Sequence, residues 1–394
     1  MRPPRFTRRR LLAAGGLSLL GGAVLDPSWT AGAASDAAVD GWPMERRDPA
    51  RTGFDPDGTA PRGEFSVRWR ATVPEPSYRT RPLAVVDGNV YAVGEDELVA
   101  VAADSGETRW RFDGESRPWR EYVGFTSSPA AFDGGVVVAS QTDVLGFAAA
   151  SGRLDWSYDE TTNVETPLLV GNTVYCEASG DGTLVLDAET GLSRRRSPLS
   201  TDFEPFAYRE GVLVGRGDSP DKLVAVDAAT GDRLWTETFA IASAFFLSPS
   251  LGRETVYYGT GPLYAISLAD GSVRWEGDLG ASRAGTRPVT DGDRVYVVAA
   301  DEETRFVVAF DAETGERVWR ADANAADEAV PAVVDDTLYV TTPTGFVALD
   351  AADGGEVGRF RPTRRRGSTR SPVVVDGTVY VALDDTLYAV EGSA

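Results

Sequence analysis

Short apolar runs recur along the chain. Turn residues end each run before it reaches the length of a helix. In one stretch, Pro288 to Thr290 is followed by the pair Asp291-Gly292, and then by the apolar runs Val295 to Val298 and Phe306 to Phe310. Asp-Gly pairs favour tight hairpins because the central residues of such turns need positive φ. The pattern therefore predicts repeats of four short antiparallel strands.

A proline opens the first strand of each repeat, and successive prolines are 38 to 47 residues apart. The prolines are Pro82, Pro129, Pro167, Pro205, Pro249, Pro288, Pro331 and Pro372. This period is that of a propeller blade. The last repeat ends after three strands near Val390, while an orphan strand, Phe65 to Arg70, precedes the first. We predict an all-β fold, an eight-bladed β-propeller of four-stranded antiparallel blades whose last blade is closed by the N-terminal strand.

One phrase, Asp-Ala-x-Thr-Gly followed by Trp four residues after the Gly, recurs within the repeats. The Gly permits a tight turn, and we expect the indole to pack between adjacent blades. The Trp residues with this expected docking role are Trp69, Trp110, Trp156, Trp235, Trp275 and Trp319. Two copies carry Arg195 or Gly358 at the Trp position, so we expect those seams to be the weakest.

The phrase resembles the tryptophan-docking repeat of pyrroloquinoline-quinone-like propellers, and the resemblance covers about residues 65–391. Enzymes of that family use the quinone, a Ca²⁺ ion, a catalytic Asp and commonly a disulfide between adjacent cysteines. This chain has a single cysteine, Cys176, so that disulfide cannot form. The non-catalytic branch is similar to an eight-bladed outer-membrane assembly lipoprotein that binds a partner protein. The chain departs from that lipoprotein because no Cys follows its leader.

Residues 1–33 have the pattern of an export signal. Arg8-Arg9-Arg10 precedes an apolar stretch from Leu11 to Leu25, and Ala31-Gly32-Ala33 is a cleavage-site pattern. The basic run resembles the twin-arginine export motif. General secretory export and an uncleaved anchor are the alternatives, and membrane association is expected only for the anchor. We therefore expect a secreted or cell-surface protein.

Residues 34–64 are rich in Gly, Pro, Ala and charge, which predicts a linker and an irregular lead-in. We expect Trp42-Pro43-Met44 and Gly53-Phe54 to pack on the outside of the domain. Residues 65–394 then form the propeller as one domain.

A ligand site is expected at one mouth of the central channel, where the residues preceding each opening proline converge. The charged residues at these positions are Arg81, Glu165, Glu204, Arg287 and Arg370. Three Arg beside two Glu could bind a carboxylate, a sugar acid or the acid groups of a quinone. The same residues could instead form an ion-pair network around a hydrated channel mouth.

A second candidate site is the segment from Gly114 to Tyr122. It presents Arg117, Trp119 and Tyr122, residue types enriched at binding hot spots. We expect this loop to contact a protein partner.

The charge balance narrows the partners. The chain has 60 acidic and 39 basic residues, a net charge of −21, a single Lys (Lys222) and no His. An acidic surface repels nucleic acids and anionic lipids, and the absence of His excludes a Ser–His–Asp triad. We expect a monomeric, non-catalytic scaffold, without metal or cofactor, that binds a cell-surface protein or a small ligand. The alternative is a quinone- and Ca²⁺-dependent dehydrogenase of alcohols or sugars.

The acid excess, with almost no Lys, resembles that of salt-adapted proteins and generates a testable prediction. Added KCl should raise the midpoint of thermal unfolding, because salt screens repulsion within the folded state. The rise should be steep at low salt, since the screening length falls from about 30 Å at 0.01 M to about 8 Å at 0.15 M. A midpoint that stays level or falls over this range, measured by circular dichroism, would contradict the prediction.

Overall fold

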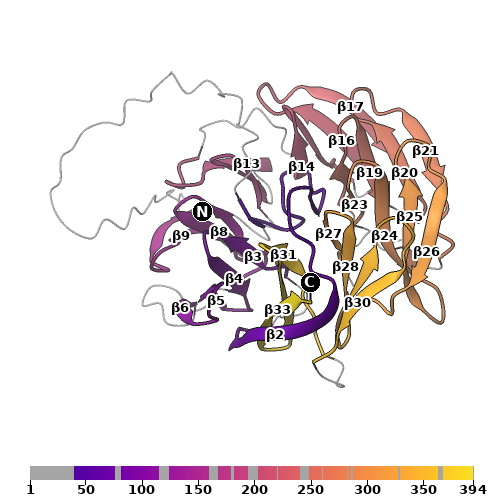
Figure 1. Ribbon diagram of the computed structural model, residues 1–394. Coiled ribbons are helices and arrows are strands. Elements are labelled where there is room, and N and C mark those ends of the chain that lie inside the picture. The colour runs from indigo at the N-terminus through magenta and orange to yellow at the C-terminus, as the bar shows by residue number, and fades with distance from the viewer. Residues whose placement is uncertain are drawn as a thin grey trace, which may run out of the picture.

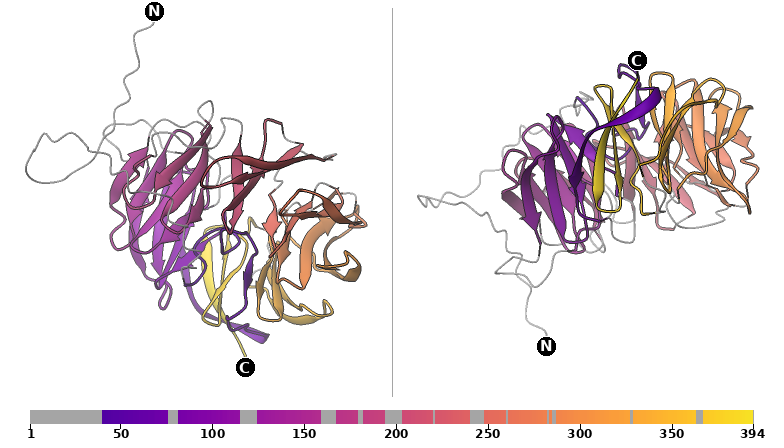
Figure 2. Two further views of the ribbon diagram at one scale, coloured as in Figure 1. Left: turned by 90° about the horizontal axis from the view of Figure 1, so that it is seen from above. Right: turned by 60° about the horizontal axis from the view of Figure 1, so that its bottom comes forward.

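The computed structural model describes most of the chain from residue 40 onward. The described ranges are 40–75, 81–114, 124–158, 167–178, 182–193, 203–219, 221–239, 248–259, 261–281, 283–284, 287–326, 329–362 and 367–393. Within them the regular structure is all β, and the antiparallel sheets are arranged side by side in a β-propeller (Figures 1 and 2). None of these residues forms a helix with the length and apolar character of a membrane span.

The strands group into sheets in chain order. The first is β3 (Ala84–Val86), β4 (Asn89–Val93), β5 (Glu97–Ala102) and β6 (Thr108–Asp113). The second is β7 (Ala130–Phe132), β8 (Gly135–Ala139), β9 (Val144–Ala148) and β10 (Leu154–Tyr158), and the third is β11 (Leu168–Val170), β12 (Thr173–Ala178) and β13 (Gly182–Asp187). The fourth is β14 (Glu204–Arg209), β15 (Val212–Arg216), β16 (Lys222–Asp227) and β17 (Arg233–Thr238).

The remaining sheets continue the same order. The fifth is β18 (Ser250–Leu251), β19 (Thr255–Gly259), β20 (Leu263–Ser267) and β21 (Val273–Gly277). The sixth is β22 (Arg283–Ala284), β23 (Val289–Thr290), β24 (Arg294–Ala300), β25 (Arg305–Asp311) and β26 (Arg317–Asp322). The last is a nine-stranded sheet of β1 (Phe54–Asp55), β27 (Ala332–Val334), β28 (Thr337–Thr342), β29 (Gly345–Asp350), β30 (Glu356–Phe360), β2 (Gly63–Thr72), β33 (Thr386–Gly392), β32 (Thr378–Leu383) and β31 (Val373–Val375).

The innermost strands meet around a common axis. Neighbouring pairs in contact are β3 with β7, β11 with β14, β14 with β18, β18 with β23, β23 with β27 and β27 with β31. The pair β31 and β3 also makes contact, which brings the last strands of the chain against the first sheet. The core is accordingly divided into apolar clusters that bridge neighbouring sheets, such as the one joining Tyr91, Trp110 and Phe147.

Strand β2 ties the chain ends together. It pairs antiparallel with β33 from Phe65–Gly392 to Thr72–Thr386, which confirms the predicted closure by the N-terminal strand. At its beginning, Gly63 and Glu64 also pair parallel with Gly358 and Arg359 of β30. Two of the expected blades are therefore joined in one sheet, which differs from the prediction of separate blades.

Gly358 shows why that join forms. A Cβ at this position would collide with the Phe65 ring and the Gly63 backbone, so only glycine lets β2 approach β30. Phe65 then packs edge-on against Phe346, with ring centroids 4.9 Å apart. The seam at Gly358, which we expected to be weak because it lacks a Trp, is therefore held by backbone pairing between β2 and β30. The other such position, Arg195, lies outside the described residues.

The six Trp residues with the expected docking role lie between neighbouring sheets. Each donates its Nε1–H to a backbone carbonyl of the next sheet around the ring, at 2.7 to 3.1 Å. The donor–acceptor pairs are Trp69–Ala103, Trp110–Ala149, Trp156–Ala188, Trp235–Leu268, Trp275–Ala312 and Trp319–Ala351. Each indole also lies over the Gly of that sheet's turn, where a Cβ would meet the ring.

Tyrosines of the second strand reinforce three of these seams. The hydroxyl of Tyr296 donates to the Asp291 carboxylate at 2.6 Å and lies 3.4 Å from the Ala351 carbonyl, which accepts from Trp319. Tyr257 shares the Ala312 carbonyl with Trp275, and Tyr380 shares the Ala103 carbonyl with Trp69. Two side chains of one sheet therefore converge on one acceptor of the next.

The Asp of the phrase holds its turn together. The Asp311 carboxylate accepts from the Thr314 N–H at 2.8 Å, the Thr314 hydroxyl at 2.9 Å and the Glu313 N–H at 3.1 Å. These hydrogen bonds lower the pKa of Asp311 below its ordinary value, because they favour the charged form. The turn thereby fixes Gly315, on which the Trp275 ring lies.

Replacing Trp110 with Phe tests the seam contact. The Trp110→Phe variant keeps an aromatic ring but deprives the Ala149 carbonyl of its donor, so the free energy of unfolding in urea should fall by about 1–3 kcal/mol. The control Val318→Ala alters an exposed outer-strand side chain and should change stability by less than about 0.5 kcal/mol. Equal effects of the two variants would count against the seam.

The pH dependence of the Asp311→Asn variant tests the turn. A lowered native pKa stabilises the fold at pH values above the unfolded pKa of Asp, about 3.9, and this stabilisation is lost as pH falls through the native pKa. The wild type should therefore be more stable than Asp311→Asn at pH 7, and the difference should shrink below about pH 4. A difference that is constant from pH 7 to pH 2.5, followed by urea denaturation, would disprove this role.

Candidate functional site

Residues 41–55, here called the axial segment, lie among the innermost strands (Figure 1). Trp42 is 2% and Met44 3% exposed, and both belong to core clusters with inner-strand residues. The expectation that Trp42-Pro43-Met44 packs on the outside was wrong. These apolar side chains are buried because they join cores that bridge the sheets.

The backbone of the axial segment accepts hydrogen bonds from successive innermost strands. The amides of one residue in each of six strands donate to its carbonyls at 2.7 to 2.8 Å. The donor–acceptor pairs are Val85–Trp42, Ala131–Pro43, Tyr208–Pro49, Leu251–Ala50, Thr290–Thr52 and Val333–Gly53. The segment therefore follows the ring of innermost strands in chain order.

Strand directions show that the axial segment is U-shaped. Trp42 pairs antiparallel with Val85, so the chain enters from the side where β3 turns at Asp87. β1 runs parallel with β27 and leaves on the same side, where β27 turns at Asp335. The middle of the segment reaches toward the opposite side, where the innermost strands begin.

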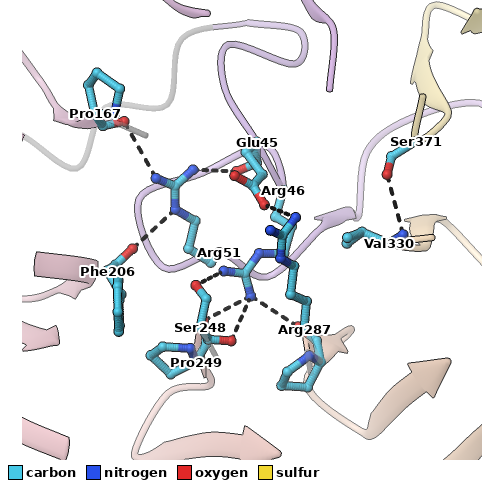
Figure 3. A network of polar contacts seen from close by, with 11 residues as sticks. Glu45, Arg46, Arg51, Pro167, Phe206, Ser248, Pro249, Arg287, Val330 and Ser371 are labelled. Carbon is cyan, nitrogen blue, oxygen red and sulfur yellow. Dashed lines mark hydrogen bonds and ion pairs between the residues drawn. The ribbon is translucent and has the colours of Figure 1, made fainter. Parts of the chain in front are cut away.

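Two arginines of the axial segment fill the middle of the site (Figure 3). Arg46 donates from Nη1 to the carbonyls of Pro249 at 2.9 Å, Pro288 at 3.3 Å and Ser248 at 3.4 Å, and from Nη2 to the Ser248 hydroxyl.

Arg51 makes a similar set of contacts on the other side. It donates to the Phe206 carbonyl at 3.2 Å, the Pro167 carbonyl at 3.5 Å and the Glu45 carbonyl at 2.7 Å. Arg46 and Arg51 together reach the starts of β11, β14, β18 and β23.

Burial makes these guanidiniums unusual. Each of the two residues is 3% exposed, and desolvation lowers the pKa of Arg46 to about 9 and also lowers that of Arg51. Nearby Glu45 opposes this effect in both cases by favouring the charged form. Arginine keeps its charge in proteins, so both side chains act here as charged hydrogen-bond donors.

The residues predicted to form a ligand site are engaged within the protein. Arg287 pairs with Glu45 of the axial segment at 3.0 Å, while Glu204 pairs with Arg216 of β15. In the described contacts, Arg287 and Glu204 therefore pair with Glu45 and Arg216 and not with each other.

Arg81 and Arg370 lie next to each other. Arg370 is fully buried and donates to the carbonyls of Arg81 at 2.9 Å and Pro74 at 2.7 Å. Arg81 donates to the carbonyls of Gly94 and Phe125, which joins the first sheet to the second. Burial, with a smaller contribution from Arg81, lowers the pKa of Arg370 to about 9.

The remaining sequence candidates fall outside the described residues. These are Glu165, the loop residues Arg117, Trp119 and Tyr122, and the export signal over residues 1–33. Cys176 is described and buried, and burial raises its pKa to about 12, so its thiol is protonated and unreactive at neutral pH.

The described residues do not fit the Ca²⁺ of a quinone-dependent enzyme. Ca²⁺ takes 6–8 oxygen ligands, several of them carboxylates. The described carboxylates of Glu45, Glu204 and Asp55 are paired with Arg287, Arg216 and Arg47. That of Asp48 accepts from the Thr52 N–H at 3.1 Å. No group of three or more Asp, Glu, Cys or His in the described ranges is arranged to hold a metal ion.

Sequence reasoning missed the axial segment because its charged residues have the pattern of a solvated lead-in. One signal was present, the apolar Trp42 and Met44 within an otherwise polar stretch. The opening prolines were a second signal, since the carbonyls of Pro167, Pro249 and Pro288 accept from the two arginines.

A protein-family profile described as "Outer membrane protein assembly factor BamB", built on the PQQ-like repeat, matches residues 64–205, 96–243 and 219–391. The overlapping matches cover most of the chain. The chain belongs to this family.

Curated relatives match over a shorter range. The BamB of Alkalilimnicola ehrlichii is 28% identical over 192 residues, 45% of this chain and 48% of that protein. The BamB of Bordetella pertussis is 27% identical over 194 residues, 45% of this chain and 49% of that protein. The chain thus matches about half the length of each relative.

Solved structures show the fold in two functional settings. BamB from Moraxella catarrhalis superposes with a TM-score of 0.63 at 16% identity, over 83% of this chain and 97% of that one. Quinohemoprotein alcohol dehydrogenase from Comamonas testosteroni superposes with a TM-score of 0.66 at 13% identity, over 94% of this chain and 83% of that one. At such low identity, the similarity establishes the fold alone.

Proposed function

We propose that this protein is an exported, non-catalytic β-propeller scaffold that binds a protein partner at the cell surface. The observation that carries the proposal is the occupied axis, where Arg46 and Arg51 donate to inner-strand carbonyls and Arg287 pairs with Glu45. Because these groups are bonded within the propeller, fewer of them are available to bind a substrate at this mouth of the channel. Membership of a family described as an assembly factor supports a protein partner.

The proposal includes the count of eight blades. The nine-stranded sheet divides naturally into β27 to β30 and β31 to β33 completed by β2, with the pairing of Gly63 and Glu64 as the join. The contact of β31 with β3 supports closure of the ring at this point. Such a ring presents its outer strands and connecting loops to a partner.

The partner site that we propose is the loop bearing Arg117, Trp119 and Tyr122. Trp, Tyr and Arg carry most of the binding energy in many interfaces. Export by a twin-arginine type of signal, in residues 1–33, would place this loop outside the cytoplasm.

Site-specific crosslinking in cell-surface extract at high salt tests the proposal. A photo-crosslinker at Trp119 should yield one saturable adduct, and excess unlabelled protein should abolish it. The matched control is the same crosslinker at Arg153, whose side chain is 72% exposed on another sheet. The Arg117→Ala, Tyr122→Ala double variant should compete at least about tenfold less well than wild type. Identical adducts at both positions, or equal competition, would contradict the proposed site.

The quinoprotein alternative is tested separately. Purified protein is incubated with the quinone and Ca²⁺, and dye reduction is followed with alcohols and sugars. We expect no turnover above the protein-free control. Saturable turnover would overturn the non-catalytic assignment.

A further inference from the structure

We propose that the axis of the ring is a binding site for arginine side chains on a U-shaped peptide segment, and that Arg46 and Arg51 are its resident ligands. This inference goes beyond the proposed function and starts from the same occupied axis, but it concerns what the axis binds and not the loop near Trp119. The ligand class is a guanidinium group carried by a peptide backbone that turns within the ring.

The ring supplies the acceptors of this site. Carbonyls at the starts of four innermost strands face the two guanidiniums, at Pro167, Phe206, Pro249 and Pro288. Three of these residues are the prolines that open the repeats. The Ser248 hydroxyl adds a side-chain acceptor. A fork of several N–H donors suits such a dispersed set of oxygens better than the compact ammonium of Lys.

The ring also supplies the donors that hold a peptide backbone. One edge of the innermost strands faces the axis, and the amides of Ala131, Tyr208, Leu251 and Thr290 donate from this edge to the axial segment. A peptide lying along the axis therefore has its carbonyls bound by amides and its arginines bound by carbonyls. This combination recognises both the backbone and the side chain.

The axial segment is bound in a strained conformation. Arg46, Arg47 and Arg51 have φ of 55°, 68° and 59°, the left-handed region that side chains with a Cβ disfavour. Contacts must offset this strain. Some lie within the segment, such as the hydrogen bond from the Gly53 N–H to the Arg46 carbonyl, and the others are made with the ring.

Arg47 provides a matched control within the same segment. It shares the positive φ but makes its ion pair with Asp55, also of the axial segment, at 3.0 Å. The inner-strand carbonyls of Pro249 and Phe206 accept from Arg46 and Arg51, and not from Arg47. Removing it should leave recognition by the ring largely intact.

Controlled nicking of the folded protein tests the proposal. A protease site is inserted between Asp57 and Gly58, in the connection between β1 and β2, where Asp57 is exposed. After cleavage, a labelled peptide of residues 40–57 is added in excess under mildly destabilising temperature, and its incorporation is followed by fluorescence polarisation. We expect the wild-type peptide to replace the nicked segment.

Variant peptides give the decisive comparison. Arg46→Met and Arg51→Met should each bind at least about tenfold more weakly than wild type, since each loses several charged hydrogen bonds, and Lys at either position should not restore binding. Arg47→Met should bind within about threefold of wild type. Equal binding of all the peptides, or incorporation of none, would overturn the trans-binding site. Appearance of dimers on nicking would identify a second copy's segment as the occupant and would support the site.

The intact chain supplies a second readout that does not require exchange. The double variant Arg46→Met, Arg51→Met should be cleaved at the inserted site, and exchange the amides of the axial segment, at least about tenfold faster than the Arg47→Met variant. Equal rates in the two variants would show that the arginines do not anchor the segment, and would overturn the proposal.

Discussion

The innermost strands of the ring have an inner edge that pairs with no other strand of the same repeat, and the rest of the arrangement depends on how the amides and carbonyls of this edge are satisfied. Leaving them unpaired away from water would cost free energy at every sheet. In this protein the axial segment of the same chain pairs with these groups. Its carbonyls accept from amides such as Ala131 and Leu251, and its arginines donate to carbonyls such as Pro249 and Phe206. One short stretch therefore contacts most of the sheets at once.

The outer part of the ring is held by a different device. Indole N–H groups cross each described Trp seam to a turn carbonyl, and Tyr hydroxyls approach the same carbonyl at three of them. Where Gly358 stands in place of Trp, β2 enters and pairs with both flanking strands. The same strand carries Trp69, which docks on the first sheet. Residues of the N-terminal region therefore take part in the contacts at the axis, in one Trp seam and in the closure of the ring.

The local part of this design could be predicted from the sequence. Strand spacing, the Asp-Gly turns and the repeated phrase depend on near neighbours, so the repeats and the closing strand followed from the pattern. The axial segment could not be predicted in that way, because Arg46 contacts residues more than 200 positions away and its stretch has no strand periodicity. Arg81 and Arg370 lie shortly before the innermost strands β3 and β31. What they bind there, backbone carbonyls of neighbouring sheets, depends on the assembled ring.

The axial segment occupies the ring axis in the native protein. Hydrogen exchange at the inner-edge amides of Ala131, Tyr208, Leu251, Thr290 and Val333 tests this directly. We predict protection comparable to that of amides in the middle of the sheets, since each donates to a carbonyl of the segment. Exchange of these amides at the rate of exposed turn residues, in an otherwise folded protein, would mean that the axis is open and not occupied by the segment.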